Sequence, residues 1–203
     1  FMRYGHFSDD YKEYVITDPK TPTPWINYIS NLKGYCGIVS QTGGGFSFHK
    51  DPRDRRITKY RYNNVPVDRP GRYIYIKDEE SCEYWSPTWQ PVQKELDSYQ
   101  CHHGLGYTKI NSSYNDISSE VLYFVPQDHE CEIWQLKLKN NSDKRRTLSI
   151  YPYAEFTTWS EPQSRNIQWS LHLTNSEFED GMVFYRFLEP HPAFSMEENE
   201  DYL

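Results

Sequence analysis

Aromatic rings, guanidinium groups and amides are interleaved in two neighbouring segments of this chain. The first reads Tyr-Arg-Tyr-Asn-Asn-Val-Pro-Val-Asp-Arg-Pro-Gly-Arg over residues 60–72, and the second reads Tyr-Trp-Ser-Pro-Thr-Trp-Gln-Pro over residues 84–91. Prolines restrict the backbone in both segments, which favours a pre-formed surface. A flat, hydroxylated ligand needs both kinds of residue, because a ring covers the apolar face of a pyranose while planar groups bind its hydroxyls. The pattern therefore indicates a sugar-binding surface.

Arg61 is the sugar contact that we predict in the first segment, where it stands between two tyrosines. A structural role stays open for Arg61 and Arg72, since an Arg between aromatic side chains often stacks on them and pairs with a carboxylate, here Asp68. Trp85 and Trp89 are four residues apart across a proline, which excludes a shared helix face. We expect these two rings in an ordered loop, at an interface or in the core.

Composition bounds the fold class and the partners. The 203 residues fit one domain, including one large all-β domain. Apolar residues make up only 36%, but aromatic residues reach 17%, and each large ring buries enough area for a core to remain feasible. The formal net charge of -7 argues against a nucleic-acid partner.

The cysteines and the hydropathy of the chain predict its compartment. Cys36, Cys82, Cys101 and Cys131 are tens of residues apart and form no Cys-x-x-Cys pair, so we expect neither a zinc site nor another metal or cofactor. No apolar segment is long enough to span a bilayer, and no secretion signal is recognisable. These features predict a cytoplasmic protein with reduced thiols and no membrane partner.

Period-two alternation of apolar and polar residues predicts an all-β fold. Over residues 134–139, one Trp and two Leu alternate with one Gln and two Lys, which is typical of a half-buried strand. Many short antiparallel strands with regular turns predict a large β-sandwich. The other predicted strands are residues 35–40, 46–49, 72–77, 106–110, 120–125, 147–151, 168–174 and 182–187. Turns are predicted at residues 78–81, 115–116, 140–144 and 180–181.

Two stretches interrupt this pattern, and a third ends it. Residues 18–25 contain three prolines and cannot belong to a central strand. The Gly-Gly-Gly at residues 43–45 predicts a flexible hinge before the next strand. Residues 196–203 are acidic and without periodicity, which suggests that the chain is cut from a longer protein.

A series of motifs in collinear order, up to about residue 156, resembles the opening of the cellobiose phosphorylases of glycoside hydrolase family 94. The motifs are Met-Arg-Tyr-Gly-His-Phe at residues 2–7, Glu-Tyr-Val-Ile-Thr at 13–17, Pro-Trp-Ile-Asn-Tyr at 24–28, Gly-Gly-Phe-Ser-Phe at 44–48, Asp-Arg-Pro-Gly-Arg-Tyr at 68–73, Trp-Gln-Pro at 89–91, His-Gly-Leu-Gly-Tyr at 103–107 and Phe-Val-Pro at 124–126.

The resemblance implies a specific reaction. Members of this family are cytoplasmic homodimers that split a β-linked disaccharide with inorganic phosphate, invert the anomeric centre and release an α-sugar 1-phosphate. Their chain begins with a β-sandwich, often called a supersandwich, and continues into an (α/α)6 barrel that holds the catalytic acid. This sequence resembles only the sandwich, so we expect residues 1–203 to be that N-terminal domain without the barrel. We therefore assign no catalytic residue.

Two segments match the parts of the family's sandwich that wall the acceptor-sugar subsite. In the first, strand alternation places Phe46 and Phe48 on one face and Ser47 and His49 on the other. The phenylalanines then belong to the core and His49, where relatives usually have Tyr, is the predicted sugar contact. The second segment spans residues 166–171 and resembles the family pattern Asn-x-Gln-x-(Ser or Asn)-Leu, which places Gln168 at the subsite.

Trp169 departs from the family pattern, because cellobiose-specific members carry Arg directly after that Gln. An Arg offers a fork of donors to sugar hydroxyls, whereas a Trp offers a stacking face and one N–H, so the acceptor preference is expected to differ from plain glucose. Arg165 could supply the missing guanidinium from a neighbouring position, although a simple exposed Arg is the alternative.

Three functions remain open at this point. The leading one is the N-terminal domain of a disaccharide phosphorylase that converts cellobiose and phosphate to α-glucose 1-phosphate and glucose, or that takes chitobiose, a cellodextrin or cellobionic acid instead. The second is a non-catalytic carbohydrate-binding sandwich, and the third is a purely structural domain whose rings are all buried.

Overall fold

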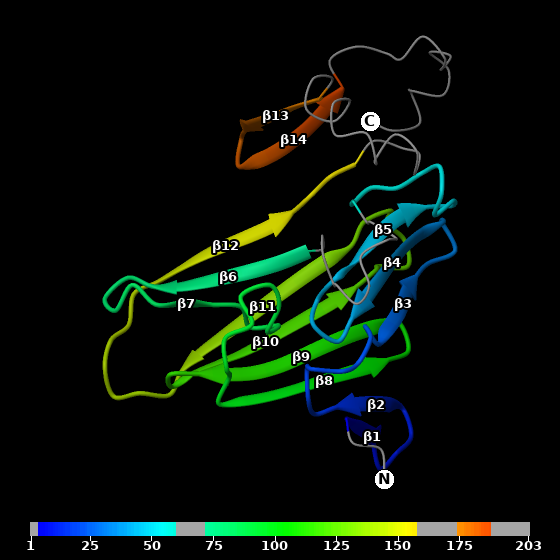
Figure 1. The fold of residues 1–203 in the computed structure, drawn as a ribbon. Helices are drawn as coiled ribbons and strands as arrows, with labels where there is room; N and C mark the ends of the chain where they lie inside the picture. The colour runs from blue at the N-terminus through cyan, green and yellow to red at the C-terminus, as the bar shows by residue number, and fades with distance from the viewer. Residues whose placement is uncertain (1–3, 60–71, 158–173, 188–203) are drawn as a thin grey trace.

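The computed structural model describes residues 4–59, 72–157 and 174–187, and these ranges contain fourteen strands and no helix (Figure 1). Every pair of neighbouring strands runs antiparallel. Among the described residues, nothing has the helical length and hydropathy needed to cross a bilayer. The predicted all-β fold is confirmed.

A six-stranded sheet is the base of the fold, with the order β1-β2-β8-β9-β10-β11. Its strands are β1 (Gly5–Phe7), β2 (Glu13–Ile16), β8 (Ser98–Gly104), β9 (Tyr107–Tyr114), β10 (Ile117–Phe124) and β11 (Ile133–Asn140). Asn115 and Asp116 join β9 to β10 in a two-residue turn with φ values of 49° and 62°, the backbone geometry that tight hairpins require. On β9 and β10, buried and half-buried residues alternate, so one face of the sheet is turned to the core.

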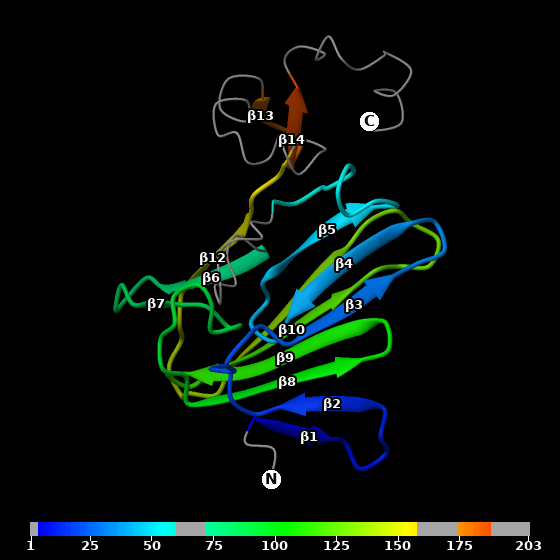
Figure 2. The same cartoon turned by 45° about the vertical axis from the view of Figure 1, so that its right-hand side comes forward.

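A three-stranded sheet lies over one end of this base, as Figure 2 shows. It contains β3 (Ile26–Ser30), β4 (Tyr35–Ser40) and β5 (Gly45–His49). Asn27 on β3 ties the two sheets together, because its Nδ2 donates to the carbonyls of Gly104 (2.9 Å) and Tyr107 (2.8 Å) at the turn between β8 and β9. A side chain that satisfies two backbone acceptors at once fixes the relative position of the layers.

The remaining strands form a second three-stranded sheet, in the order β12-β6-β7, and a hairpin. They are β6 (Arg72–Asp78), β7 (Tyr84–Trp85), β12 (Leu148–Ala154), β13 (Thr174–Glu179) and β14 (Met182–Phe187). One continuous core joins the sheets, and Ile16, Val39, Ile76, Ile110 and Val121 in it are fully buried. Because this core draws on the base and on both smaller sheets, the fold is a layered sandwich.

The strand predictions agree with most of the structure. The strand at residues 35–40 coincides with β4, and those at 46–49, 72–77, 106–110, 120–125, 134–139, 147–151 and 182–187 coincide with or overlap β5, β6, β9, β10, β11, β12 and β14. On β11 the predicted faces are observed, since Trp134, Leu136 and Leu138 are half-buried and the residues between them are exposed. The strand at residues 168–174 lies outside the described residues except for Thr174, which opens β13.

The flexible hinge expected at residues 43–45 is wrong. Gly43 and Gly45 are buried in a tight turn between β4 and β5, with φ values of 83° and 108°. Ser40 holds this turn, because its N–H donates to the Gly44 carbonyl (3.0 Å) and its Oγ accepts from the Gly44 N–H (3.0 Å). A Cβ at Gly45 would lie 2.0 Å from the Ile38 carbonyl oxygen, so the glycine is needed for close approach and not for flexibility.

Candidate functional site

His49 ends β5 and is the one predicted site residue that lies within the described ranges. Its side chain is 18% exposed. Its Nε2 lies 3.2 Å from the Lys33 carbonyl oxygen and 3.4 Å from Glu130 Oε1. The imidazole is thus oriented by two oxygen atoms from neighbouring loops and keeps part of its surface open to a ligand.

The face of β5 that carries Ser47 and His49 is not a continuous ligand surface. Ser47 is only 1% exposed. On the opposite face, Phe46 is buried and its ring centroid lies 5.9 Å from that of Phe48. The alternation predicted for the strand is present, but only His49 at its end remains accessible on the predicted contact face.

Ser47 belongs to a buried ion-pair cluster, the Arg72 cluster, which we define as Arg72, Glu132, Ser47 and Trp134. Arg72 is 0% exposed, and its Nε lies 2.8 Å from Oε1 of Glu132, whose side chain is 3% exposed. Arg72 Nη2 donates to Ser47 Oγ (2.8 Å), and Ser47 Oγ donates in turn to Glu132 Oε2 (2.7 Å). Trp134 Nε1 donates to Glu132 Oε1 at 2.7 Å. Each charge is therefore paired inside the protein.

The Arg72 cluster holds three sheets together. Arg72 comes from β6, Ser47 from β5 and Trp134 from β11, and Arg72 Nη1 also donates to the Ile38 carbonyl of β4 (2.9 Å). The neighbouring Gly37 leaves room for the carboxylate, since a Cβ there would lie 2.4 Å from Glu132 Oε2. Arg72 has the structural role that the sequence left open, with Glu132 as its carboxylate partner.

The other predicted site residues, Arg61, Arg165, Gln168 and Trp169, lie outside the described residues, as does Asp68. Their roles at the acceptor-sugar subsite stay predictions.

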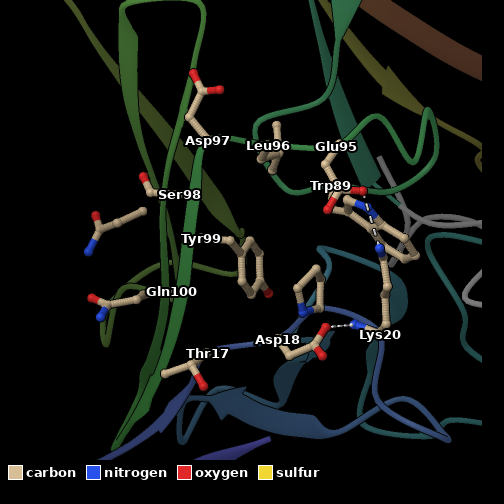
Figure 3. Close-up of a pocket in the computed structure, with 12 residues that line it drawn as sticks. Thr17, Asp18, Lys20, Trp89, Glu95, Leu96, Asp97, Ser98, Tyr99 and Gln100 are labelled. Atoms are coloured by element: carbon tan, nitrogen blue, oxygen red, sulfur yellow. Dashed lines mark hydrogen bonds and ion pairs between the residues drawn. The ribbon is translucent and has the colours of Figure 1, made fainter.

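A groove of about 750 Å³ opens at the other end of the β3-β4-β5 sheet, between β8 and the loop that follows β7 (Figure 3). In Figure 3, Ser98, Tyr99 and Gln100 stand on the β8 side, and Trp89 and Glu95 stand on the opposite side. The residues that line it are Thr17, Asp18, Pro19, Lys20, Trp89, Glu95, Leu96, Asp97, Ser98, Tyr99, Gln100 and Asn111. We call it the Trp89 groove.

A smaller cavity of about 230 Å³ adjoins the Trp89 groove and shares Pro19, Lys20 and Trp89 with it. Gln41 and Gln90 are among its other lining residues.

The two tryptophans of the second aromatic segment have different roles. Trp85 is 1% exposed and belongs to the core, while Trp89 is half-buried at the groove. The sequence singled out Trp89, but the facing loop at residues 17–20 carried no signal beyond Pro19.

Two described carboxyl groups, Asp78 and Glu13, are poorly suited to donate a proton. Arg146 lowers the pKa of Asp78, to which it donates from Nε at 3.0 Å. The Tyr107 hydroxyl donates to Glu13 and lowers the pKa of that carboxyl, while the same contact raises the pKa of Tyr107 to about 12. A carboxyl group that acts as a general acid needs a raised pKa instead.

No group of three or more His, Cys, Asp or Glu side chains in the described ranges is placed to hold a metal ion. All four cysteines are free thiols, and burial raises the pKa of Cys101.

Comparison with known proteins identifies the family. The model for the glycosyl hydrolase 94 supersandwich domain matches residues 12–194. The N,N'-diacetylchitobiose phosphorylase of Vibrio proteolyticus is 42% identical over 187 residues, which are 91% of this chain and 23% of that protein. The solabiose phosphorylase of Paenibacillus borealis is 35% identical over 161 residues, or 76% of this chain and 20% of that protein. The chain thus spans about a quarter or less of these relatives, and it belongs to glycosyl hydrolase family 94 as a supersandwich domain.

Proposed function

We propose that the protein carrying this chain is an inverting disaccharide phosphorylase, and that the chain is the sandwich that walls its acceptor-sugar subsite. The observation that carries this proposal is the match of 187 residues, at 42% identity, to a relative named as a phosphorylase. The reaction breaks the glycosidic bond of a β-linked disaccharide, forms a bond from phosphate to the anomeric carbon and gives an α-sugar 1-phosphate with a free acceptor sugar.

The chemistry of the reaction determines which groups this chain has to supply and which it does not. Phosphate is already an anion, so one carboxylic acid that protonates the leaving oxygen is enough. The two buried carboxylates described above, Asp78 and Glu132, each form an ion pair with an arginine, and Arg146 lowers the pKa of Asp78. We therefore assign the acid and the phosphate ligands to a helical barrel outside this chain. The chain's own part is to orient the acceptor, with His49 as its described contact.

The names of the relatives support N,N'-diacetylchitobiose, and not cellobiose, as the substrate in this proposal. Two Vibrio proteins named for that activity match 91% of this chain at 42% and 41% identity. Trp169 agrees with this preference, because it replaces the Arg of cellobiose-specific members with a stacking surface. A relative named cellobionic acid phosphorylase, from Neurospora crassa, is 30% identical over 106 residues.

Assembly as a homodimer is part of the proposal. Apolar side chains stand exposed on β12 to β14, including Tyr151 (52%), Phe178 (76%) and Val183 (63%). Such a surface favours burial against a second subunit or the barrel. The free thiols agree with action in the cytoplasm.

The direct test uses the protein purified from its host with an antibody raised against this chain. It is incubated with N,N'-diacetylchitobiose or cellobiose, with and without phosphate, and the products are followed by ³¹P and ¹H NMR. We expect phosphate-dependent release of an α-sugar 1-phosphate, fastest from the N-acetylated disaccharide. Hydrolysis without sugar phosphate, or no reaction with any β-linked disaccharide, would contradict the proposal.

Trp169→Arg tests the acceptor assignment in the same protein. The added fork of donors should shift the ratio of kcat/KM values towards cellobiose by roughly tenfold. Tyr28→Ala, which removes an exposed ring from β3, is the matched control and should leave that ratio unchanged. An unchanged ratio in Trp169→Arg would remove this residue from the subsite.

A further inference from the structure

We propose that the Trp89 groove is a second carbohydrate-binding site, and that it takes a neutral, β-linked hexopyranose oligosaccharide. This site lies at the opposite end of β5 from His49. Thr88 is near the start of that strand, since a Cβ at Gly43 would lie 3.3 Å from Thr88 Cβ, whereas His49 ends the strand. A ligand in the groove is therefore separate from the acceptor wall.

The size and continuity of the groove suit more than one sugar ring. A cavity of about 750 Å³ is within the range of small-ligand sites, and the adjoining cavity of about 230 Å³ extends it past Trp89. Trp89, Pro19 and Lys20 border both parts, so a linear ligand could pass from one to the other beside the indole ring.

The backbone at Trp89 is held in an unfavourable conformation. Its φ of 71° lies in the left-handed region, which a bulky aromatic residue rarely adopts. Two backbone hydrogen bonds fix it there, from the Trp89 N–H to the Ser86 carbonyl (3.0 Å) and from the Gln93 N–H to the Trp89 carbonyl (2.7 Å). Strain of this kind persists where the surroundings over-determine it, and here its effect is to place an indole ring against an open groove.

Gln90 supplies an independent sign of a missing partner. It is only 7% exposed, lines the smaller cavity, and its Oε1 accepts no hydrogen bond from any described residue. A buried acceptor of this kind costs free energy unless a donor reaches it, and a sugar hydroxyl is such a donor. Next to the Trp89 ring, this acceptor completes the pairing of stacking face and polar group that a pyranose needs.

Amide side chains continue the polar surface along the β8 side. Gln100 and Asn111 are cross-strand partners on β8 and β9, so their side chains are neighbours at the groove. Neither side chain makes a hydrogen bond to another described residue. Amides both donate and accept, which matches the dual character of sugar hydroxyls.

The charges of the groove select a neutral ligand. Asp18, Glu95 and Asp97 line it, and Lys20 is the one basic lining residue, with its Nζ 3.3 Å from Glu95 Oε2. The negative balance disfavours phosphorylated or uronic sugars. The choice of the β-linked series rests on the proposed function, and a β-linked chain also offers flat apolar faces to a ring and hydroxyls along its edges.

The experiment is a titration of the full chain, without phosphate, with three tetrasaccharides: cellotetraose, tetra-N-acetylchitotetraose and maltotetraose as the α-linked comparison. Isothermal calorimetry gives the affinity, and the indole N–H signals in ¹⁵N-¹H NMR report the site. We expect at least one β-linked tetrasaccharide to bind, and maltotetraose to bind more weakly by roughly tenfold or more.

Variants locate the binding. Trp89→Ala should weaken it roughly tenfold, and Trp89→Tyr should restore part of it. Because Trp89→Ala could disturb the loop, Gln100→Ala combined with Asn111→Ala provides a second loss through surface side chains, and Tyr28→Ala is the control without effect. Circular dichroism checks that each variant is folded.

Three outcomes would overturn the proposal: no binding of either β-linked tetrasaccharide, binding that both groove variants leave unchanged, or saturable binding of Ca²⁺ or Mg²⁺ at the carboxylates without sugar binding. None of these depends on turnover. Failure of the groove is thus distinguishable from failure of the phosphorylase assignment, which the release of sugar phosphate tests separately.

Discussion

The Arg72 cluster and the Trp89 groove both combine rings with polar groups, yet they differ in where the partners of those groups are found. In the cluster, Arg72 and Glu132 form an ion pair (2.8 Å) and Ser47 bonds to both of them, while Arg72 Nε makes no hydrogen bond of good geometry to a described residue. In the smaller cavity beside the Trp89 groove, Gln90 Oε1 has no partner among the described residues, and the Trp89 ring borders both spaces. Polar groups that are paired internally define architecture, whereas unpaired ones at a cavity point to a ligand.

Arg72→Met gives the largest expected effect. It leaves the buried Glu132 carboxylate without its counter-charge, so we expect a loss of about 3–5 kcal/mol in the free energy of unfolding, measured by urea denaturation. Lys137→Met is the matched control, because the Lys137–Glu120 pair is largely exposed and should contribute less than about 1 kcal/mol. A small effect of Arg72→Met would mean that the cluster does not hold the sheets together.

His103 should make the free energy of unfolding depend on pH. Burial lowers its pKa from 6.5 to about 4. Its Nε2 donates to the Trp25 carbonyl (3.0 Å), so in the neutral ring Nδ1 accepts from the Thr108 hydroxyl (3.0 Å). The same Trp25 carbonyl accepts from the backbone N–H of Gln41 (3.0 Å), which lines the smaller cavity beside the Trp89 groove.

The direction of this pH dependence follows from proton uptake by the unfolded chain. Between pH 6.5 and pH 4 the unfolded chain binds a proton at His103 and the folded chain does not, so stability is present above pH 6.5 and falls as the pH decreases to 4. The whole shift corresponds to roughly 3 kcal/mol. His103→Gln should flatten this slope in denaturation measured at several pH values, while His6→Gln, at an exposed position, should keep it. An equal slope in both variants would contradict the assignment.

Ser47→Ala tests the cluster more gently. It removes one hydrogen bond to Arg72 and one to Glu132. Because these two charged groups remain paired with each other, we expect a total loss of about 2 kcal/mol, close to the contribution of a single hydrogen bond to a charged group. Differential scanning calorimetry would show it as a lower Tm. An unchanged Tm would mean that water replaces the Ser47 hydroxyl, and that the Arg72 cluster is open to solvent.

Gln90→Met is the counterpart in the smaller cavity beside the Trp89 groove, and it has the smallest expected effect on stability. Because Gln90 Oε1 accepts no hydrogen bond, its removal should change the free energy of unfolding by no more than about 0.5 kcal/mol, or raise it. Sugar binding should nevertheless weaken, as calorimetry would show. A destabilisation equal to that of Ser47→Ala would mean that this oxygen has a structural partner, and the contrast between the two regions would fail.

Alternation in the sequence was sufficient to predict most of the sheets, because one face of strands such as β10 and β11 is turned to the core. It missed β8, whose sequence Ser-Tyr-Gln-Cys-His-His-Gly is almost entirely polar. That strand lies inside the base sheet, and among its residues only Cys101 and Gly104 are buried. Its polar side chains are bonded to neighbours or line the groove, which a count of apolar residues cannot reveal.

The candidate sites depended on contacts between residues distant in the sequence. Arg72 was expected to pair with a nearby carboxylate, but its partner is Glu132, which directly precedes β11 and is brought close by the fold. The Trp89 groove is built from residues 17–20, the segment around 89–100 and Asn111, so no local motif could predict it. Both Phe46 and Phe48 were predicted in the core from strand alternation, which is a local property; Phe46 is buried, whereas Phe48 is only half-buried.

The most direct test of this contrast is a ¹⁵N-¹H NMR titration of the chain with tetra-N-acetylchitotetraose and cellotetraose, in which the side-chain amide of Gln90 and the indoles of Trp89 and Trp134 are assigned. Our account predicts saturable shifts for Gln90 and Trp89, and no shift for Trp134 in the Arg72 cluster. Shifts confined to Trp134, or none at all with either sugar, would contradict it.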